Sequence, residues 1–300
     1  MTKRSKKSDG RSGGLEALNL FFESHYKDRW PHLLGALQES EKQTARKNLF
    51  ADSSTVKLEP WQGLESCFVW SGGEQTRDSN GLLEFYIMDP ASVICARALE
   101  VKDGDRVLDM CAAPGGKTLI LIEALLNSGE IIANELSAGR RERLKKVIQQ
   151  YVSREVRNRV WVTGKDAGLF AKSHPDYFDR ILVDAPCSGE RHLLHSPKDL
   201  SEWSPSRSQK LAQRQYALLT AALYSLKEGG RIVYSTCSIS NLENDLVIER
   251  LLDKKKSQFE VVKVNYGGEE TQFGQQFFPD QSGYGPIYFS ILEKTRRQIP

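Results

Sequence analysis

The chain has 300 residues, of which 39% are hydrophobic and 27% are charged, and its formal net charge is +3. These values are typical of a soluble globular protein, and no apolar run approaches the ~20 residues that a membrane-spanning helix needs. The first residues, MTKRSKKSDGRSGG, lack the apolar segment of a secretory signal.

The five cysteines are an odd number and include no C-x-x-C pair. This count argues against a disulfide framework and against a zinc site, so we expect no metal ion and a reducing compartment. We therefore predict a cytoplasmic protein, or a mitochondrial one if the source is eukaryotic.

The first 80 residues divide into a tail and an extension. Residues 1–14 carry a net charge of +4. We expect a disordered tail there, which either attracts polyanions or only solubilises the chain. From Leu15 to about Phe50, apolar residues recur near helical spacing and Pro31 interrupts them, which predicts two or more helices. Residues 51–80 mix Ser, Gly, Trp and charge, which predicts a loop-rich connector with a strand at Cys67–Trp70.

From residue 81 onward, segments typical of strands and of helices alternate. We predict strands at 107–110, 131–134, 160–163, 180–183, 231–234, 259–264 and 286–292. We predict helices at 91–100, from 117 on, and at 137–151, 208–226 and 241–252. Ser240 and Glu243 form a predicted capping box for the last helix. This alternation indicates a mostly parallel, doubly wound α/β sheet, in which ligands bind beyond the carboxyl ends of the strands.

The stretch RVLDMCAAPGGKT, residues 106–118, joins the first of these strands to its helix through a Pro-Gly-Gly turn. A dinucleotide fold would need G-x-G-x-x-G, which is absent. Gly116-Lys117-Thr118 matches the second half of a P-loop, but Cys111 occupies the position of its first glycine, which disfavours that class. The remaining class binds S-adenosylmethionine, whose amino-acid end would face the turn.

Polar residues follow the other strands. Glu135 lies about twenty residues after Gly115, where an acid accepts hydrogen bonds from ribose hydroxyls, and a solvated carboxylate is the alternative. Asp166 is a candidate for the adenine amino group. Asp109 is a candidate for a structural role, in which it binds backbone N–H groups of its own turn.

Cys187 and Cys237 lie in polar turns, DAPCSG and STCS, just past two strands. A thiolate that adds to carbon 6 of cytosine turns carbon 5 into an enamine carbon, which is able to attack a methyl sulfonium. An acid that contacts N3 assists this addition, and Asp184 is placed for it. Enzymes that methylate base amines instead carry Asn or Asp followed by Pro-Pro and an aromatic residue, so that activity is disfavoured.

Three motifs, DMCAAPGGKT, ILVDAPCSG and YSTCS, resemble in letters and in order those of the RNA cytosine-C5 methyltransferases of the Nop/Sun family. The resemblance covers about residues 82–293, and EFYIMDPAS, CSGERHLLH and GPIYFSILEK are most similar to the mitochondrial ribosomal-RNA branch of that family. It implies a Rossmann-like, seven-stranded methyltransferase domain at 81–300 after an N-terminal helical extension at 15–80.

The resemblance also implies roles for individual residues. It implies that Cys237 is the nucleophile and that Cys187 resolves the covalent intermediate, whereas in DNA cytosine methyltransferases the Pro-Cys cysteine attacks. Asp184 would hold the base. The residues implied to contact S-adenosyl-L-methionine or the base are Cys111, Ala112, Ala113, Pro114, Gly115, Gly116, Lys117, Glu135, Arg140, Asp166 and Asp184. Many members have Asp where Glu135 stands, a change that still suits a ribose contact.

RNA is the implied substrate, and small-subunit ribosomal RNA is favoured. The sequence contains no separate RNA-binding module, so the N-terminal helices, the tail and Arg191, His192 and His195 bind the RNA, or an accessory RNA-binding partner does. The helix face with Arg141 and Lys145 either contacts phosphate or is a solvated surface. We expect a monomer without membrane contact. The alternative function is a non-catalytic RNA-binding ribosome assembly factor of the same fold, although the intact motifs argue against it.

Overall fold

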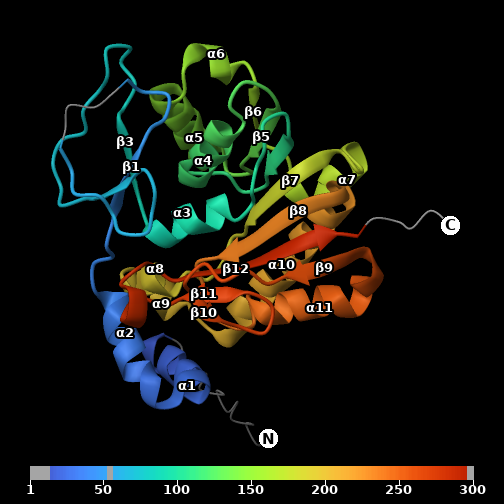
Figure 1. The fold of residues 1–300 in the computed structure, drawn as a ribbon. Coiled ribbons are helices and arrows are strands. Elements are labelled where there is room, and N and C mark those ends of the chain that lie inside the picture. Colours follow the sequence, from blue (N-terminus) through green and yellow to red (C-terminus); the bar gives the residue numbers. More distant parts are fainter. Residues whose placement is uncertain (1–13, 53–56, 296–300) are drawn as a thin grey trace, which may run out of the picture.

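The structure is a computed structural model of the chain, and it describes residues 14–52 and 57–295. The predicted tail at 1–14 lies outside the described residues except for Gly14. Figure 1 shows a large central sheet flanked by helices, with the N-terminal helices below it and a small sheet at the upper left. None of the helices in the described ranges is long and apolar enough to cross a lipid bilayer.

One mixed sheet of nine strands forms the centre of the molecule, in the order β10-β11-β12-β8-β7-β4-β5-β6, with β9 paired to β12. The parallel strands are β4 (Arg106–Asp109), β5 (Glu130–Asn134), β6 (Val160–Thr163), β7 (Phe178–Asp184) and β8 (Leu226–Thr236). The antiparallel strands are β9 (Phe259–Val262), β10 (Glu269–Glu270), β11 (Gln275–Phe277) and β12 (Ile287–Lys294). All seven predicted strands are present, and the short β10 and β11 extend the sheet to nine.

Helices cover both faces of this sheet, so the prediction of a doubly wound α/β fold is confirmed. One face packs against α3 (Pro90–Arg97), α4 (Gly116–Ala124) and α5 (Ala138–Tyr151), and the other against α7 (Phe170–Ser173), α10 (Pro205–Ser225) and α11 (Asp245–Lys255). Val107 of β4 belongs to the first core and Leu108 to the second, because successive side chains of a strand point to opposite faces.

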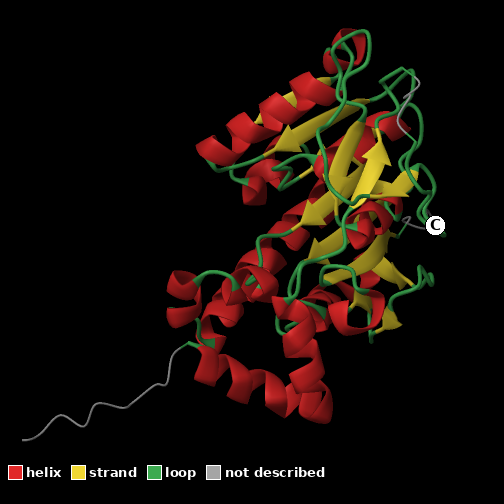
Figure 2. Cartoon of the chain, turned by 90° about the vertical axis from the view of Figure 1, so that its left-hand side faces the viewer, coloured by secondary structure: helices red, strands yellow, loops and turns green. Residues whose placement is uncertain are grey.

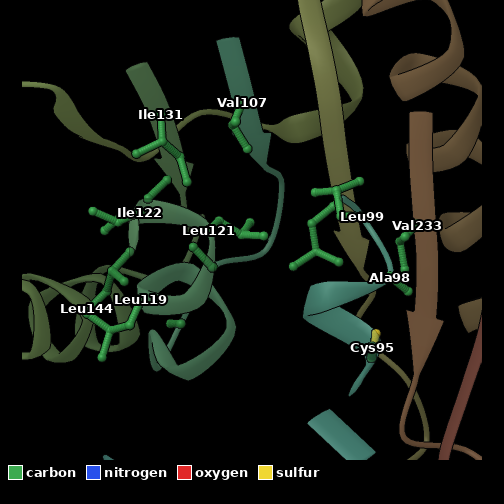
Figure 3. Packing of buried hydrophobic residues seen from close by; sticks show 14 of the residues in the cluster. Cys95, Ala98, Leu99, Val107, Leu119, Leu121, Ile122, Ile131, Leu144 and Val233 are labelled. Carbon is green, nitrogen blue, oxygen red and sulfur yellow. The ribbon is translucent and has the colours of Figure 1, made fainter. Parts of the chain in front are cut away.

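The core on the α4 side positions the Pro-Gly-Gly turn. Figure 3 shows that α4 contributes Leu119, Leu121 and Ile122 to a cluster with Val107 of β4 and Ile131 of β5. Each of these side chains is buried, and burying one stabilises the fold by about 1.5–3 kcal/mol. This packing fixes the start of α4 against the sheet.

The N-terminal extension is a helical hairpin of α1 (Leu15–Tyr26) and α2 (Trp30–Gln38), joined by the 3₁₀ turn η1 (Lys27–Arg29). Its buried Phe22 and Trp30 cluster with Leu193, in the short helix α8 (Glu190–Leu194) after β7, and with Ile239, in the loop after β8. Pro31 lies in the first turn of α2, where a missing N–H costs nothing. Figure 2 shows mainly helices, joined by loops, at this lower end of the molecule, with most of the sheet above them.

A small antiparallel sheet, in the order β2-β1-β3, follows the hairpin. Its strands are β1 (Thr44–Lys47), β2 (Cys67–Val69) and β3 (Phe85–Met88). The strand predicted near Cys67 is confirmed, but helix up to Phe50 is wrong at 44–47. The helical apolar pattern ends at Leu37, and β1 gains backbone hydrogen bonds from partners on both sides. The predicted domain boundary at residue 80 stays a prediction.

Short helical segments complete the loops beyond the strands. These are α6 (Arg154–Arg157), α8 (Glu190–Leu194), α9 (Pro197–Ser201), α12 (Pro279–Ser282), η2 (Ala167–Leu169) and η3 (Lys256–Gln258). The predicted capping box is wrong, because α11 begins only at Asp245. Glu243 instead accepts hydrogen bonds from the Ser188 N–H and from Gln215, while Ser240 Oγ is buried with no partner among the described residues.

Candidate active site

A cavity of about 910 Å³ lies at the carboxyl ends of β4, β7 and β8. Its walls include Pro114 and Lys117 from the turn after β4, the segment 184–189 after β7, and Cys237 after β8. A smaller cavity of about 260 Å³ adjoins it on the side of Gly115 and Gly116. Predicted site residues from three distant parts of the chain therefore meet at one edge of the sheet.

The turn after β4 requires its two glycines. Gly115 has a φ of 124°, which L side chains rarely adopt, and a Cβ at Gly116 would lie 2.7 Å from a ring carbon of Tyr86. Because α4 begins at Gly116, the free N–H groups and positive end of this helix lie at the smaller cavity. A carboxylate is favoured at such a place.

Asp109 brings a carboxyl group to the same cavity. Its Oδ2 accepts a hydrogen bond of 2.7 Å from Thr118 Oγ1, whereas its Oδ1 is buried without a partner among the described residues. Burial raises the pKa of Asp109 to about 7. A helix start beside a carboxyl group with a free oxygen fits the carboxylate and the ammonium of an amino acid, the end of S-adenosylmethionine that the sequence analysis places here.

Lys117 and Asp184 form an ion pair on the wall shared by the two cavities. Lys117 Nζ donates to Asp184 Oδ2 at 2.9 Å, and Ser235 Oγ donates to Oδ1 at 2.8 Å. Burial lowers the pKa of Lys117, but the charge and the hydrogen bond of Asp184, together with the nearby thiols of Cys95 and Cys237, outweigh it, and the net shift is upward. Both oxygens of Asp184 thus bind protein groups, and Lys117 is engaged by a carboxylate instead of being free for the phosphates that a P-loop binds.

Cys187 and Cys237 lie side by side on the wall of the larger cavity. Their Sγ atoms are 2.7 Å apart, and the backbone N–H of Cys237 donates to Cys187 Sγ at 3.2 Å. Cys237 is exposed and Cys187 half-buried. The hydrogen bond to Cys237, followed by burial, raises the pKa of Cys187 well above the ordinary value for cysteine. Cys187 therefore retains its proton, and Cys237 is the more accessible of the two thiols to a ligand in the cavity.

Glu135 and Arg140 lie beside the turn after β4. Glu135 is buried and accepts a hydrogen bond of 2.9 Å from the Ser137 N–H. Arg140 Nε lies 3.6 Å from the other oxygen of Glu135, and its Nη2 donates to the carbonyl of Ala113 at 2.6 Å. Arg140 lines the larger cavity, whereas Glu135 lines neither cavity.

Asp166 lies outside both cavities as well. It accepts hydrogen bonds from the Gly168 N–H at 3.0 Å and from Arg214 of α10. These contacts lower the pKa of Asp166, with the Arg214 contact as the largest cause. The role of Arg214 is not predictable from the sequence, because nothing in α10 indicates which of its charged side chains contacts Asp166, 48 residues away.

The role of Asn134 is likewise not predicted from the sequence. Its side-chain amide donates to the carbonyls of Met110 and Lys165, and its oxygen accepts from Thr163 Oγ1 and from the Lys165 N–H. This buried side chain fastens the ends of β4, β5 and β6 to one another. A polar residue that ends an apolar strand was the only signal in the sequence.

The predicted RNA contacts differ in how far their side chains are engaged within the protein. His192 lines the larger cavity and is exposed, and its Nε2 lies 3.8 Å from Asp199 Oδ2. His195 makes hydrogen bonds with the carbonyls of Arg191 and Gln38, so its ring serves the loop structure. On α5, Arg141 donates to the carbonyls of Glu135 and Leu136, and Lys145 pairs with Glu142. Arg141 therefore supports the loop after β5 instead of presenting a free charge.

Two comparisons bear on the fold and on the relatives of the chain. A crystal structure of NSun6 from Pyrococcus horikoshii with SFG has a TM-score of 0.77 and 21% sequence identity, over 95% of this chain and 99% of that one. At this identity the likeness shows the fold alone. The mouse (Mus musculus) 5-cytosine rRNA methyltransferase NSUN4 is 34% identical over 93% of this chain and 88% of its own length.

Further relatives and a family profile agree with this similarity. The NSUN4 protein of Bos taurus is 38% identical over 92% of this chain and 87% of its own length. Ribosomal RNA small subunit methyltransferase F of Escherichia coli is 40% identical over 54% of this chain and 34% of its own length. The profile described as 16S rRNA methyltransferase RsmB/F matches residues 96–293. This chain belongs to the RsmB/F family of RNA methyltransferases.

Proposed function

We propose that the chain methylates carbon 5 of cytosine in RNA through a covalent bond between Cys237 and carbon 6 of the base. The observation that carries the proposal is the pair of sulfurs of Cys187 and Cys237, 2.7 Å apart in a cavity shared with Lys117 and Asp184. Methylation at carbon 5 requires an addition to the ring and the later removal of a proton from it. Two adjacent thiols, one exposed and one half-buried, suit these two tasks.

S-adenosylmethionine, when bound, supplies the electrophilic methyl group. Its amino-acid end fits the start of α4 and Asp109, and the residues that line the approach are Cys111 to Lys117. Glu135, just after β5, and Arg140, on α5, lie beside this turn and suit the ribose, and Asp166 suits the adenine amino group. The SFG in the similar Pyrococcus horikoshii structure is an analogue of this cofactor, which supports the choice.

The cysteines divide the work on the ring. The Cys237 thiolate adds to carbon 6, which forms an S–C bond and makes carbon 5 nucleophilic enough to take up a methyl group. Once its sulfur is bonded to carbon, Cys237 no longer contributes the largest cause that raises the pKa of Cys187, and this favours transfer of the Cys187 proton to water. The Cys187 thiolate then removes the proton from carbon 5. As the S–C6 bond breaks, N3 returns to solvent the proton that it took up from solvent during the addition, and both the aromatic ring and the Cys237 thiolate are restored.

Asp184 assists the addition at the opposite edge of the ring. The addition places negative charge on the base unless N3 takes up a proton, and a carboxylate beside N3 favours the protonated form. Lys117 and Ser235 fix the orientation of this carboxylate by binding its two oxygens. The target nucleotide must be unpaired or flipped to enter, because carbon 6 is inaccessible within a duplex.

The proposed substrate is ribosomal RNA, and specifically that of the small subunit. The relatives named NSUN4 are rRNA methyltransferases by name, and the Escherichia coli relative is named for the small subunit. Dependence on an accessory RNA-binding partner, a monomeric state and the compartment stay predictions.

Transfer of labelled methyl groups from S-adenosylmethionine to small-subunit rRNA tests the proposal, with bisulfite sequencing to locate the methylated cytosine. We expect one or few cytosines to be labelled, and no label with Cys237→Ala. Absence of transfer to small-subunit rRNA, to large-subunit rRNA and to transfer RNA would favour the non-catalytic assembly factor.

A further inference from the structure

Two buried carboxylates lie behind the cysteines, and the proposed reaction uses neither of them. Glu190 is the first residue of α8 and Glu243 lies in the turns before α11, and both are fully buried. Neither forms an ion pair with a Lys or Arg within residues 14–52 and 57–295. Burying a carboxylate without a counter-ion is costly, so their positions need a reason.

Glu190 connects the loops of the two cysteines. Its Oε1 accepts hydrogen bonds from Ser188 Oγ and, at 3.0 Å, from Ser238 Oγ. Its Oε2 accepts a hydrogen bond of 3.0 Å from the Ile239 N–H. Because Ser188 follows Cys187 and Ser238 follows Cys237, one carboxylate binds the residue next to each sulfur. The hydroxyls of Ser188 and Ser238 are also 3.0 Å apart.

Further contacts hold each loop from its other side. Gln215 Nε2 donates to the Pro186 carbonyl at 2.9 Å and to Glu243 Oε2 at 2.8 Å, and the Ser188 N–H donates to the same Glu243 oxygen at 3.0 Å. The backbone is therefore bound immediately before and after Cys187. On the Cys237 side, Tyr26 of α1 donates to the Ile239 carbonyl at 2.5 Å.

The geometry points to Glu190 as a positioning residue that fixes the separation of the two reactive sulfurs by binding Ser188 and Ser238 together. This role rests on the proposed function, in which Cys187 acts on a ring already bonded to Cys237. The first addition needs one sulfur in place, whereas the release step needs both. Loss of the Glu190 carboxylate therefore slows release more than attack.

Thiol cross-linking measures the separation without RNA or methyl transfer. Dibromobimane bridges two nearby thiols, and peptide mass spectrometry identifies the Cys187–Cys237 bridge. In the full-length protein we expect Glu190→Gln and Ser238→Ala to lower the yield of this bridge several-fold. Ser225→Ala is the matched control, because Ser225 is equally buried but precedes β8 at the opposite edge of the sheet. Ser238→Ala keeps the carboxylate and removes one contact, so it tests the role even if Glu190→Gln fails to fold.

Turnover assays with RNA supply the second readout. We expect Glu190→Gln to lower methyl transfer about tenfold, since a lost hydrogen bond to a charged group is of that size. Adduct formation should fall less, so the covalent protein–RNA species accumulates on denaturing gels. An unchanged bridge yield in Glu190→Gln and Ser238→Ala would overturn the positioning role, as would equal losses of attack and release. If the wild-type chain transfers no methyl group to any RNA and Cys187→Ala forms no adduct, the proposed function fails, while the bridge yield still reports whether Glu190 sets the separation.

Discussion

The sulfur end of the site and its Glu135–Asp166 end are built in different ways. At the sulfur end, Ser188 and Ser238 are 50 residues apart in sequence, and buried hydrogen bonds join their loops. At the other end, Glu135 and Asp166 each bind a backbone N–H only two residues further on. The reacting groups thus depend on contacts between two distant loops, whereas Glu135 and Asp166 are held mainly within their own turns, with Arg214 as the one distant partner described above. Substitutions should therefore have larger effects at the sulfur end.

Cys237→Ala should have the largest effect, a loss of methyl transfer to background, because no other exposed sulfur lies beside Cys187 among the described residues. A single-turnover assay with labelled methyl groups measures it. Cys67→Ala is the control, since Cys67 is buried in the small sheet and should leave transfer intact. Substantial methyl transfer by Cys237→Ala would mean that another residue is the nucleophile.

Lys117→Met should lower methyl transfer at least about tenfold, because it leaves the Asp184 carboxylate without the cation that orients it. The remote pair of Lys227 and Asp179, 2.7 Å apart at the start of β7 and β8, offers a matched control. Lys227→Met should change the rate less than about twofold, as expected for a partly exposed ion pair. Equal losses in the two variants would mean that the effect is on the fold and not on the site.

Arg214→Met should raise the KM for S-adenosylmethionine about threefold and leave kcat nearly unchanged, because a partly exposed arginine orients Asp166. Initial rates at varied cofactor concentration measure both constants. Arg250→Met, which removes a guanidinium stacked on Tyr216 4.3 Å from its ring centre, is the control. A fall in kcat with unchanged KM would contradict a role at the adenine end.

Glu190→Gln should flatten the pH dependence of stability. Burial, followed by the charge of Glu243, raises the pKa of Glu190 from 4.5 to about 7. The contribution of Glu190 to the free energy of unfolding is fully present below its pKa in the unfolded chain. This contribution is lost as the pH rises through its pKa in the folded protein. In urea unfolding, the free energy of unfolding should thus decline less between about pH 5 and pH 8 in the variant than in the wild type. Some decline should remain in both proteins, because Asp109 titrates over a similar range.

The control for this pH dependence is Glu142→Gln. The hydrogen bond from Lys145 lowers the pKa of Glu142 at an exposed position, so this substitution should leave the slope above pH 5 almost unchanged. An equal flattening in both variants would contradict the assignment to the buried group.

At the sulfur end, the sequence predicts the site from the chemistry of cysteine. At the other end, it predicts the site from the position of acidic residues after strands. The strand pattern places Cys187 and Cys237 after neighbouring parallel strands, so their meeting at one edge follows from the topology. The strand pattern does not predict the contacts of Glu190 and Glu243, because their hydrogen-bond partners depend on how two loops fold against each other. Glu243 even fits a local capping box with Ser240, and the tertiary contact with Ser188 and Gln215 prevails.

The N-terminal part shows the same limit. The apolar spacing of α1 and α2 is readable, but their place against Leu193 and Ile239 is not, since nothing local in those loops indicates a helical partner. The local sequence pattern likewise does not predict β1. This strand is stabilised by pairing with two neighbouring strands, and one of them, β3, is about 40 residues away along the chain.

The most direct test of the account is the site of the covalent bond. Cys187→Ala, incubated with substrate RNA and S-adenosylmethionine, should accumulate an adduct, and mass spectrometry after digestion should place the modified pyrimidine on the peptide that contains Cys237. An adduct that instead forms on Cys187 when Cys237 is replaced by Ala would exchange the two roles and contradict the account.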